Sequence, residues 1–457
     1  MEDLELQRRM KAVGIPTADA DVRATLRVLG EPVTLFGERE YERSLRLREL
    51  LAILPDERLD ALQAAEDEPA FEQPPPDKVF YTEGTQELMD ARLKMAQFSL
   101  RRAAARLERE RASYEADPPA QEERDRRIES TLRRIAIQSS ELGDVRPVSS
   151  CTVSPDGKTL LTGSWSGRVK SWSLPTFQTE LSVAAHEERI TGVAWHPNPS
   201  GATSTGRERA AGRSSRGRAL SFATASADST AKLWAADGTE VFSLTGHASR
   251  LARLAFHPMG RHLGTASYDH TWRLWDVERG ECLLEQEGHS RPVYTVAFQN
   301  DGALAASGGL DVVGRLWDVR TGRNVLTLEG HIKPILSMDF SPNGYLLATG
   351  SMDNTARIYD LRKRDVLAVL PGHTSLVSRV RFEPTAGSYL LTCGYDRASR
   401  LWAAPTFRLT KTLLGHEDKV MDGDVCPGEA NALITSGYDR TIKVFGLDPS
   451  DAPMEEA

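Results

Sequence analysis

One segment of the chain reads Tyr268-Asp269-His270-Thr271-Trp272-Arg273-Leu274-Trp275-Asp276, a polar corner followed by an apolar strand that closes on Trp-Asp. The same closure returns at Trp317-Asp318. From His247 onward, a histidine that follows a glycine recurs at intervals of 42, 42, 42 and 43 residues. This interval is the length of one β-propeller blade, so the segment predicts a repeating all-β fold.

Seven repeats are marked by an aromatic residue that closes the third strand of each repeat. These aromatics are Trp172, Trp234, Trp275, Trp317, Tyr359, Trp402 and Phe445. Short apolar strands separated by turn residues, as in 292–307, suit a four-stranded blade that is buried on both faces. The pattern is typical of WD40 repeats, and it predicts an all-β seven-bladed WD40 propeller with an α-helical, partly extended N-terminal arm.

A histidine, a serine, an aspartate and a tryptophan recur in the same order within the repeats. Two repeats hold the complete set, namely His186, Ser226, Asp228 and Trp234, and His247, Ser267, Asp269 and Trp275. We expect these tetrads to join buried polar groups by hydrogen bonds. Since an active site is needed once and this set returns in repeat after repeat, we predict a structural role rather than catalysis or metal binding. Repeats with Gly309, Gly394 or Gly437 in the serine position should be less rigidly tied.

The last repeat lacks a fourth strand. Its strands are predicted near 420–425, 432–436 and 441–447, and only the acidic tail 448–457 follows them. The segment Ile135-Ala136-Ile137-Gln138-Ser139 alternates as an edge strand does and could complete the blade. We therefore predict a propeller over residues 132–447 in which residues 132–142 form the closing strand and remove an exposed sheet edge.

Composition excludes several classes of protein. A formal net charge of −8 disfavours a general polyanion binder, and the four cysteines show no paired metal-binding spacing. No apolar run reaches membrane length and the polar start of the chain lacks a signal-peptide core, so we expect a soluble intracellular protein with no membrane partner. The sequence contains no phosphate-loop, zinc or nucleophile motif. We predict no catalytic residue, no cofactor, no metal site and no small-molecule substrate.

Residues 1–55 have helical periodicity. Val22 and Leu26 fall on one face of a first helix, and a second helix through residues 45–54 displays a row of arginines. The arginines are Arg39, Arg43, Arg46 and Arg48. They form either a face that binds RNA or a protein partner, or a solvated surface. Residues 56–77 are acidic and rich in proline, which predicts a linker.

Residues 78–131 form the second part of the arm, an amphipathic helix and a linker. Phe80 and Tyr81 precede a long helix that is predicted over Thr85–Tyr114. Its apolar residues at heptad spacing are Leu93, Leu100 and Leu107, and the arginines on its other faces include Arg101 and Arg102. An isolated amphipathic helix needs a partner surface, which is a protein, an RNA or the propeller's own rim.

One face of the propeller is predicted to bind partners. If the strands of a blade are lettered a to d from the axis outward, the loops before strand a and the turns between strands b and c share that face. The side chains that these segments contribute are Trp165, Arg189, Arg250, Tyr268, Tyr294, Met352, Tyr395, Lys419 and Tyr438. Aromatic and arginine side chains are the types that protein interfaces favour at their strongest contacts.

The helical motif of the arm resembles a known family. The stretch Val22–Glu38, VRATLRVLGEPVTLFGE, is similar to the splicing-factor motif of the WD40 proteins of the U4/U6 small nuclear ribonucleoprotein (snRNP). Gly143–Ser149, Tyr268–Asp276 and Phe340–Tyr345 resemble the same family in the same order, so the resemblance covers nearly the whole chain. The main departure is an arginine-rich insertion at residues 207–218.

This resemblance implies a non-catalytic scaffold subunit of the U4/U6 snRNP and the U4/U6·U5 tri-snRNP, acting in pre-mRNA splicing in the nucleus. It further implies that the arm contacts U4 and U6 snRNA and snRNP proteins, and that the stretch similar to Asp77–Ala104 binds a spliceosomal cyclophilin. Arginines on short helices suit phosphate contacts that do not depend on sequence.

Two other classes of function remain open. A generic WD40 interaction scaffold, such as a ubiquitin-ligase substrate receptor, would share the ring but should lack the motif at Val22–Glu38. An enzyme built on a propeller body is a third alternative. Copurification of U4 and U6 RNA distinguishes an snRNP protein from a generic scaffold. Assays of nucleotide turnover and metal binding test the enzyme alternative.

Overall fold

The structure is a computed structural model that describes residues 19–29, 40–53, 84–114, 118–198, 220–404, 406–428 and 432–447. The chain divides into two compact units, Met1–Lys78 and Val79–Ala457. The expected features that lie outside the described residues are Arg39, Phe80, Tyr81, the linker 56–77, the insertion 207–218 and the tail 448–457.

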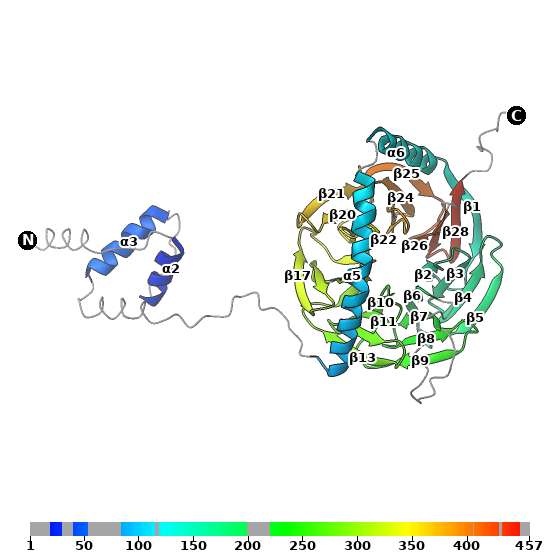
Figure 1. Ribbon diagram of the computed structural model, residues 1–457, viewed down its shortest axis with the longest axis horizontal. Coiled ribbons are helices and arrows are strands. Elements are labelled where there is room, and N and C mark those ends of the chain that lie inside the picture. Colours follow the sequence, from blue (N-terminus) through cyan, green and yellow to red (C-terminus); the bar gives the residue numbers. More distant parts are fainter. Residues whose placement is uncertain are drawn as a thin grey trace, which may run out of the picture. The chain divides into compact units, whose positions relative to one another are not determined.

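Within the described residues, seven antiparallel sheets of four strands surround a central axis (Figure 1). The prediction of a seven-bladed propeller that follows a helical N-terminal region is confirmed. The first three blades are β2 (Val148–Val153), β3 (Thr159–Ser164), β4 (Arg168–Ser173) and β5 (Thr179–Ala184); β6 (Ile190–Trp195), β7 (Leu220–Ser226), β8 (Ala231–Ala235) and β9 (Glu240–Leu244); and β10 (Leu251–Phe256), β11 (His262–Ser267), β12 (Trp272–Asp276) and β13 (Glu281–Gln286).

The next three blades follow the same a-to-d order. They are β14 (Val293–Phe298), β15 (Leu304–Gly309), β16 (Gly314–Asp318) and β17 (Arg323–Leu328); β18 (Ile335–Phe340), β19 (Leu346–Ser351), β20 (Thr355–Asp360) and β21 (Asp365–Pro371); and β22 (Val377–Phe382), β23 (Tyr389–Gly394), β24 (Ala398–Ala403) and β25 (Arg408–Leu414). Blade seven contains β26 (Val420–Val425), β27 (Leu433–Gly437), β28 (Thr441–Leu447) and β1 (Ile135–Leu142).

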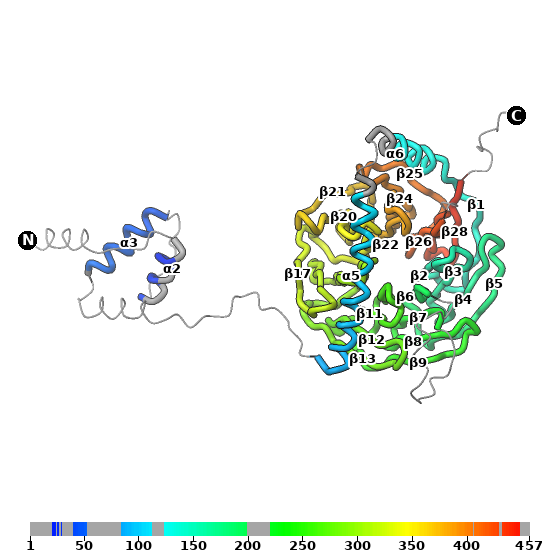
Figure 2. The backbone as a smooth tube through the Cα atoms, viewed as in Figure 1, coloured from blue at the N-terminus to red at the C-terminus, as the bar shows by residue number. Residues whose placement is uncertain are grey.

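The ring closes by pairing the two ends of the propeller. Strand β1 is antiparallel to β28, in a register that runs from Ile135 opposite Leu447 to Leu142 opposite Thr441. Figure 2 shows β1 beside the red β28, although these strands are far apart in the sequence. Blade seven therefore has its fourth strand, which is the closure that the alternating segment suggested.

Burial in each blade follows the position of its strand. In β19, the second strand of blade five, every residue is buried, because both faces of the sheet pack against neighbouring blades. In β17, the outer strand of blade four, buried or half-buried residues alternate with exposed ones. The apolar core therefore lies between blades, and the outer strands carry the polar surface of the ring.

The first unit contains two packed helices among its described residues, α2 (Asp19–Val28) and α3 (Glu40–Ile53). Val22 and Leu26 of α2 form an apolar cluster with Leu47 and Leu51 of α3. Arg43 lies one turn before Leu47 and is only 4% exposed. The prediction that Arg43 belongs to an outward arginine face is therefore wrong, because Arg43 lies one turn from Leu47 on the buried side of α3.

Helix α5 (Gln86–Tyr114) lies across one face of the propeller (Figure 1). Its residues Leu88, Ala91 and Met95 join an apolar cluster with residues of blades three and four. The leucines at heptad spacing lie on the other side of the helix, and their exposed fractions are 60% for Leu93, 62% for Leu100 and 45% for Leu107. The propeller is thus one partner of the helix, and the predicted leucine stripe is not the face that docks on it.

A second helix of the arm, α6 (Pro118–Arg133), lies where the sequence predicts a linker after the helix that ends at Tyr114. The cluster that contains Leu132 also contains Ile135 and residues of blades six and seven. Lys411 Nζ donates a hydrogen bond to the carbonyl oxygen of Arg133 at 2.6 Å. The helix therefore delivers the chain to the closing strand. Within the described residues, no helix is long and apolar enough to cross a membrane.

Candidate interaction surfaces

The tetrad histidines are fixed by the same two hydrogen bonds in six blades. In each, Nδ1 lies 2.7–2.9 Å from an aspartate oxygen, and Nε2 lies 2.7–2.9 Å from a hydroxyl oxygen. The histidines are His186, His247, His289, His331, His373 and His416. Each is buried four residues ahead of an inner strand.

The hydroxyl that completes the tetrad is not the one that the sequence suggested. In blade three, Trp275 Nε1 donates to Thr265 Oγ1 at 2.8 Å, and the same oxygen lies 2.8 Å from His247 Nε2. Ser267, two residues later, instead bonds the backbone carbonyls of Ser249 and Arg250. In blade two, Thr224 Oγ1 likewise bonds His186 and Trp234, and Ser226 bonds the backbone carbonyl of Arg189.

In the repeats with glycine in the serine position, the bridge from the histidine to a hydroxyl is therefore intact, and what these repeats lack is the serine hydroxyl that bonds the preceding loop in blades two and three. Gly309, Gly394 and Gly437 leave the bridging hydroxyls in place. The bridging hydroxyls in the last four blades are Ser307, Thr349, Thr392 and Thr435. Blade one alone among the described blades reverses the pair, with Asp144 in the histidine position accepting a hydrogen bond from Ser166 in the aspartate position.

The protonation states of the tetrads follow from burial and hydrogen bonding. Burial lowers the pKa of His373 and so favours the neutral ring. The hydrogen bond and the charge of Asp396 act in the opposite direction, but burial outweighs them. A neutral ring that donates from Nδ1 to the aspartate accepts the threonine hydroxyl at Nε2, so that every donor meets an acceptor. Burial acts to raise the pKa of Asp269, but hydrogen bonds from His247 and Thr271 outweigh it and hold that pKa well below its usual range.

Most of the predicted partner-binding face gathers at the mouth of the central channel. A cavity of about 150 Å³ opens there. The predicted residues that line it are Trp165, Arg189, Arg250, Tyr268, Tyr294 and Tyr395. Lys419 and Tyr438 are linked to this group by ring contacts, whereas Met352 is half-buried and does not line the cavity. We call this set of eight residues, without Met352, the channel mouth.

Cations lie over the aromatic rings of the channel mouth. The guanidinium carbon of Arg250 is 3.9 Å from the ring centroid of Tyr268, and that of Arg189 is 5.4 Å from Trp165. Lys419 Nζ is 5.5 Å from the Tyr395 ring. Such contacts are worth about 0.5–1 kcal/mol at exposed sites and hold the charged groups in fixed orientations.

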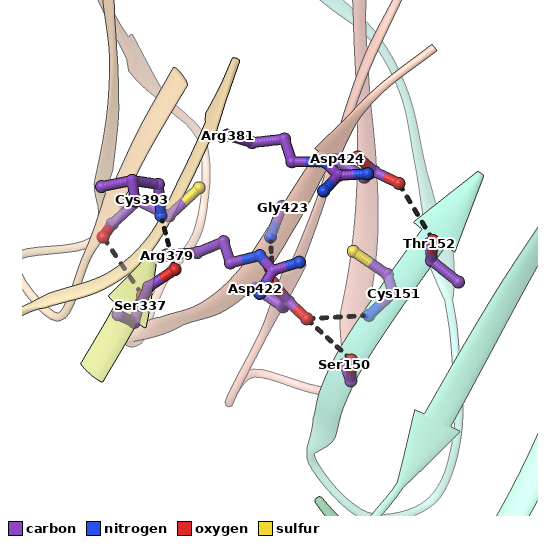
Figure 3. A network of polar contacts seen from close by, with 12 residues as sticks. Ser150, Cys151, Thr152, Ser337, Arg379, Arg381, Cys393, Asp422, Gly423 and Asp424 are labelled. Carbon is purple, nitrogen blue, oxygen red and sulfur yellow. Dashed lines mark hydrogen bonds and ion pairs between the residues drawn. The ribbon is translucent and has the colours of Figure 1, made fainter. Parts of the chain in front are cut away.

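Beneath the channel mouth lies an ion network that sequence analysis did not identify. Asp422, which is fully buried, accepts from Ser150 Oγ at 2.7 Å and from Arg253 Nη1 at 2.7 Å, and its other oxygen pairs with Arg379 Nε at 3.1 Å. Figure 3 shows Asp422 between Arg379 and the Ser150 segment. The sequence signal was available, because Arg253, Arg379 and Asp422 all stand on inner strands, where apolar residues predominate.

The same network includes a second set of ion pairs, two residues further along the inner strands of blades six and seven. Asp424 pairs with Arg381 Nε at 2.8 Å, and Asp339 pairs with Arg381 Nη1 at 3.2 Å. Asp424 also accepts from Thr152 Oγ1 (Figure 3). Attraction by Asp424, which exceeds the effect of burial, raises the pKa of Arg381. The inner strands of several blades are thus joined by compensated charge around the axis.

Helix α5 lies on the opposite face of the propeller from the channel mouth, because it contacts turns between strands a and b. Arg106 Nε pairs with Asp301 at 2.7 Å and its Nη1 donates to the Asn343 carbonyl at 3.1 Å. Arg101 and Arg102, predicted to bind partners, are exposed, and Arg102 lies over the Phe98 ring at 5.2 Å. The outer side of α5 therefore carries both exposed arginines and exposed leucines.

In the first unit, Arg46 and Arg48 of α3 are half-buried, and Arg43 is buried. Of the four predicted arm arginines, the structure thus describes three, and it leaves two of these at the surface. Among the described residues, no group of three or more histidine, cysteine, aspartate or glutamate side chains has an arrangement suited to a metal ion.

Three family models match this chain. The model described as IFT122 first beta-propeller matches residues 213–446, and the WD domain, G-beta repeat model matches 140–173 and 177–235. The model described as pre-mRNA processing factor 4 (PRP4) like matches residues 22–50, which contain most of α2 and most of α3.

Curated relatives include proteins whose names refer to the U4/U6 snRNP. The chain is 44% identical over 261 residues to the U4/U6 small nuclear ribonucleoprotein PRP4-like protein of Arabidopsis thaliana, covering 54% of this chain and 42% of that protein. It is 33% identical over 286 residues to U4/U6 small nuclear ribonucleoprotein PRP4 of Saccharomyces cerevisiae, covering 61% and 58%. An uncharacterized WD repeat-containing protein of Schizosaccharomyces pombe is 39% identical over 264 residues, covering 57% and 53%. The chain thus spans about half the length of these relatives.

Proposed function

Since this chain belongs to the WD40 β-propeller family whose model matches residues 213–446, and is homologous to the Prp4 proteins, we propose that it is a non-catalytic scaffold of the U4/U6 snRNP and the U4/U6·U5 tri-snRNP that acts in pre-mRNA splicing in the nucleus. The observation that carries the proposal is the PRP4-like segment 22–50 on the same chain as a complete seven-bladed ring. A ring alone would fit many scaffolds.

The proposal is tested by precipitating the full chain from nuclear extract and measuring the recovered RNA and proteins. U4 and U6 RNA should be enriched together with snRNP proteins. Recovery of ubiquitin-ligase subunits without these RNAs would instead support the alternative of a substrate receptor. Turnover of a nucleotide by the purified chain would support the enzymatic alternative.

Contact with U4 and U6 snRNA is assigned to the arm. Arg46 and Arg48 remain partly exposed after α2 packs on α3, and Arg39 precedes the same helix. Arginine side chains on a small helical unit can pair with phosphates without reading bases, so the contact should weaken as salt rises. Arg43 is left out of this surface because it is buried.

A charge-reversal experiment tests this assignment. Changing Arg39, Arg46 and Arg48 together to Glu should remove most U4 and U6 RNA from the precipitate, because the change replaces attraction to phosphate with repulsion. The matched control changes the same three residues to Lys, which keeps their charge and should retain salt-sensitive binding. Normal RNA recovery with the Glu variant would show that these arginines are only a solvated surface.

Binding of a spliceosomal cyclophilin is assigned to the stretch Asp77–Ala104. The outward stripe of α5 supports this, because Leu93 and Leu100 are 60% and 62% exposed although they lie on a docked helix. Phe80 and Tyr81 precede the helix and add aromatic anchors. Changing both aromatics to Ala in the full chain should weaken cyclophilin binding by about 2 kcal/mol or more.

The control for the cyclophilin experiment is Leu107→Ala, which alters the same stripe of α5 beyond Asp77–Ala104. This variant should bind the cyclophilin as the parent chain does, as measured by calorimetric titration. Equal weakening by the control and by the double Ala variant would move the contact toward the C-terminal half of α5.

A further inference from the structure

The three cations of the channel mouth differ from the arginines beneath them in their ionic partners. Within the part of the chain that the structure describes, no ion pair joins Arg189, Arg250 or Lys419 to an acidic side chain. The arginines below them are different, because Arg253 and Arg379 both pair with Asp422. Positive charge is therefore compensated on the floor of the cavity and left available at its mouth.

The ring contacts cover one face of Tyr268 and one face of Trp165, and they leave the edges of the guanidinium groups for a ligand. Arg250 covers the face of Tyr268 and Arg189 covers that of Trp165, while Trp165 meets Tyr438 edge-on at an interplanar angle of 90°. Single-stranded nucleic acid depends on open aromatic faces on which its bases can stack. A guanidinium that lies flat on a ring still presents N–H donors at its edge, which suit a carboxylate.

Acidic residues stand next to two of the channel-mouth cations in the sequence. Glu187 and Glu188 are exposed and directly precede Arg189, and Glu417 directly follows the tetrad histidine His416 two residues before Lys419. A nucleic-acid strand carries a charge at each phosphate and would bring several of them close to these carboxylates. A single carboxylate brings one negative charge to the cations and meets less of this repulsion than a strand of phosphates does.

The size of the cavity also favours a small ligand group that carries one carboxylate. Its volume is about 150 Å³, and a space of this order holds a group about the size of benzene. One amino-acid side chain fits such a space, whereas a folded domain or a helix does not. The remaining contacts would come from the rim aromatics, which are of the type that anchors protein interfaces.

We propose that the channel mouth binds the side chain of a glutamate or aspartate in an extended segment of a partner protein. Arg189 and Arg250 hold the carboxylate, Lys419 adds long-range attraction, and Trp165 and Tyr438 pack against the neighbouring residues of the segment. The proposal rests on the proposed scaffold function, which supplies a protein partner. It adds the chemistry by which that partner is recognised.

Fluorescence anisotropy of labelled probes with the full chain tests the proposal. The probes are a peptide of three Gly-Ser-Glu repeats, the matched peptide of three Gly-Ser-Gln repeats, and a uridylate nonamer. The Glu peptide should bind and the Gln peptide should not. Arg189→Gln and Arg250→Gln should each weaken the Glu peptide about tenfold, because each removes a charge-assisted hydrogen bond.

The control variant is Arg323→Gln, which makes the same change of charge on the exposed start of β17 and should leave binding unchanged. The proposal is overturned if the Glu peptide does not bind, if the Gln peptide binds equally, or if Arg323→Gln weakens binding as much as the mouth variants. Tighter binding of the uridylate through the same two arginines would identify the mouth as an RNA site instead.

The outcome is separable from that of the proposed scaffold function. Recovery of U4 and U6 RNA depends on the arm, so the variant with both Arg189→Gln and Arg250→Gln should still precipitate these RNAs while it loses the Glu peptide. Absence of the RNAs from the parent chain with intact peptide binding would reject the splicing assignment and leave the carboxylate site standing.

Discussion

At the scale of single residues, one hydroxyl decides how each blade is tied together. Thr265 Oγ1 is the shared neighbour of His247 Nε2 and Trp275 Nε1, so one side chain satisfies two buried polar groups. Ser267 is equally buried but serves the backbone of the preceding loop. A sequence pattern cannot separate these two tasks, because both residues have a hydroxyl and lie on the same strand face.

Thr265→Val is predicted to lower the free energy of unfolding by about 1–3 kcal/mol, because a methyl group replaces the hydroxyl and leaves His247 Nε2 and Trp275 Nε1 without their hydrogen-bond partner. Val has nearly the same shape, so packing changes little. Chemical denaturation measures the loss. The control is Thr412→Val on the exposed outer strand β25, and equal losses for both variants would contradict the role given to the Thr265 hydroxyl.

The tetrad histidines also predict a dependence of stability on pH. Burial depresses the pKa of His186, His331 and His373 in the folded protein below the ordinary value of 6.5. A depressed pKa means that the unfolded chain binds protons first as pH falls, so this contribution is present above about pH 6.5 and is lost below it. The melting temperature should fall between about pH 7 and pH 5 in scanning calorimetry. A flat profile in this range would contradict neutral buried histidines.

At the scale of elements, α5 is fastened to the propeller by an ion pair at its C-terminal half. Arg106 is 19% exposed and Asp301 is 7% exposed, so water screens their attraction weakly. Gly344 permits the contact, because it has a φ of +77° and an added Cβ would lie 2.7 Å from Arg106 Nε. The leucine stripe stays outward as a consequence, since these contacts fix the rotation of the helix.

A double-mutant cycle on Arg106→Ala and Asp301→Ala should give a coupling energy of about 0.5–3 kcal/mol in denaturant unfolding. The matched cycle uses Arg127 and Glu123 of α6, whose side chains are 76% and 62% exposed at 2.6 Å. That exposed pair should couple by less than about 1 kcal/mol. Comparable values for the two pairs would mean that the α5 contact is no stronger than a surface pair.

At the scale of the whole molecule, the ring depends on one strand contributed from outside the repeats. Ile135 is fully buried in β1, whereas Ile137 of the same strand is 48% exposed. Without β1, the edge of β28 would be left open for pairing with another chain. Closure therefore links the stability of the propeller to the arm that precedes it.

Ile135→Ala should lower the free energy of unfolding by about 2–5 kcal/mol, because it leaves a cavity between blades six and seven. Ile137→Ala makes the same chemical change at an exposed position and should cost less than about 1 kcal/mol. Urea denaturation followed by tryptophan fluorescence compares the two variants. Similar losses would show that β1 closes the ring through its backbone pairing rather than through Ile135.

The sequence by itself determined the ring, its seven blades and most of the residues that line the mouth of the channel. The repeat period and the closing aromatics can be read from the sequence because they are local features that recur. Six of the nine predicted face residues line the cavity, because equivalent positions in each blade lie on the same face of the ring. The edge pattern of 135–139 likewise depends only on alternation. The helical periodicity of α2, α3 and α5 was also legible, since it extends over several turns.

Only the tertiary structure decided which surfaces of these elements are used. Arg253 and Asp422 are 169 residues apart, and only closure of the ring brings them into a buried pair. Arg43 is buried, whereas Arg46 and Arg48 of the same helix are partly exposed, and periodicity could not separate them. The same holds for α5, where apolar residues occupy two faces, and contacts with distant turns select Leu88 and Met95 rather than Leu93. Local sequence pattern does not say which face of a helix will be buried. Packing between segments that are far apart in the chain decides it.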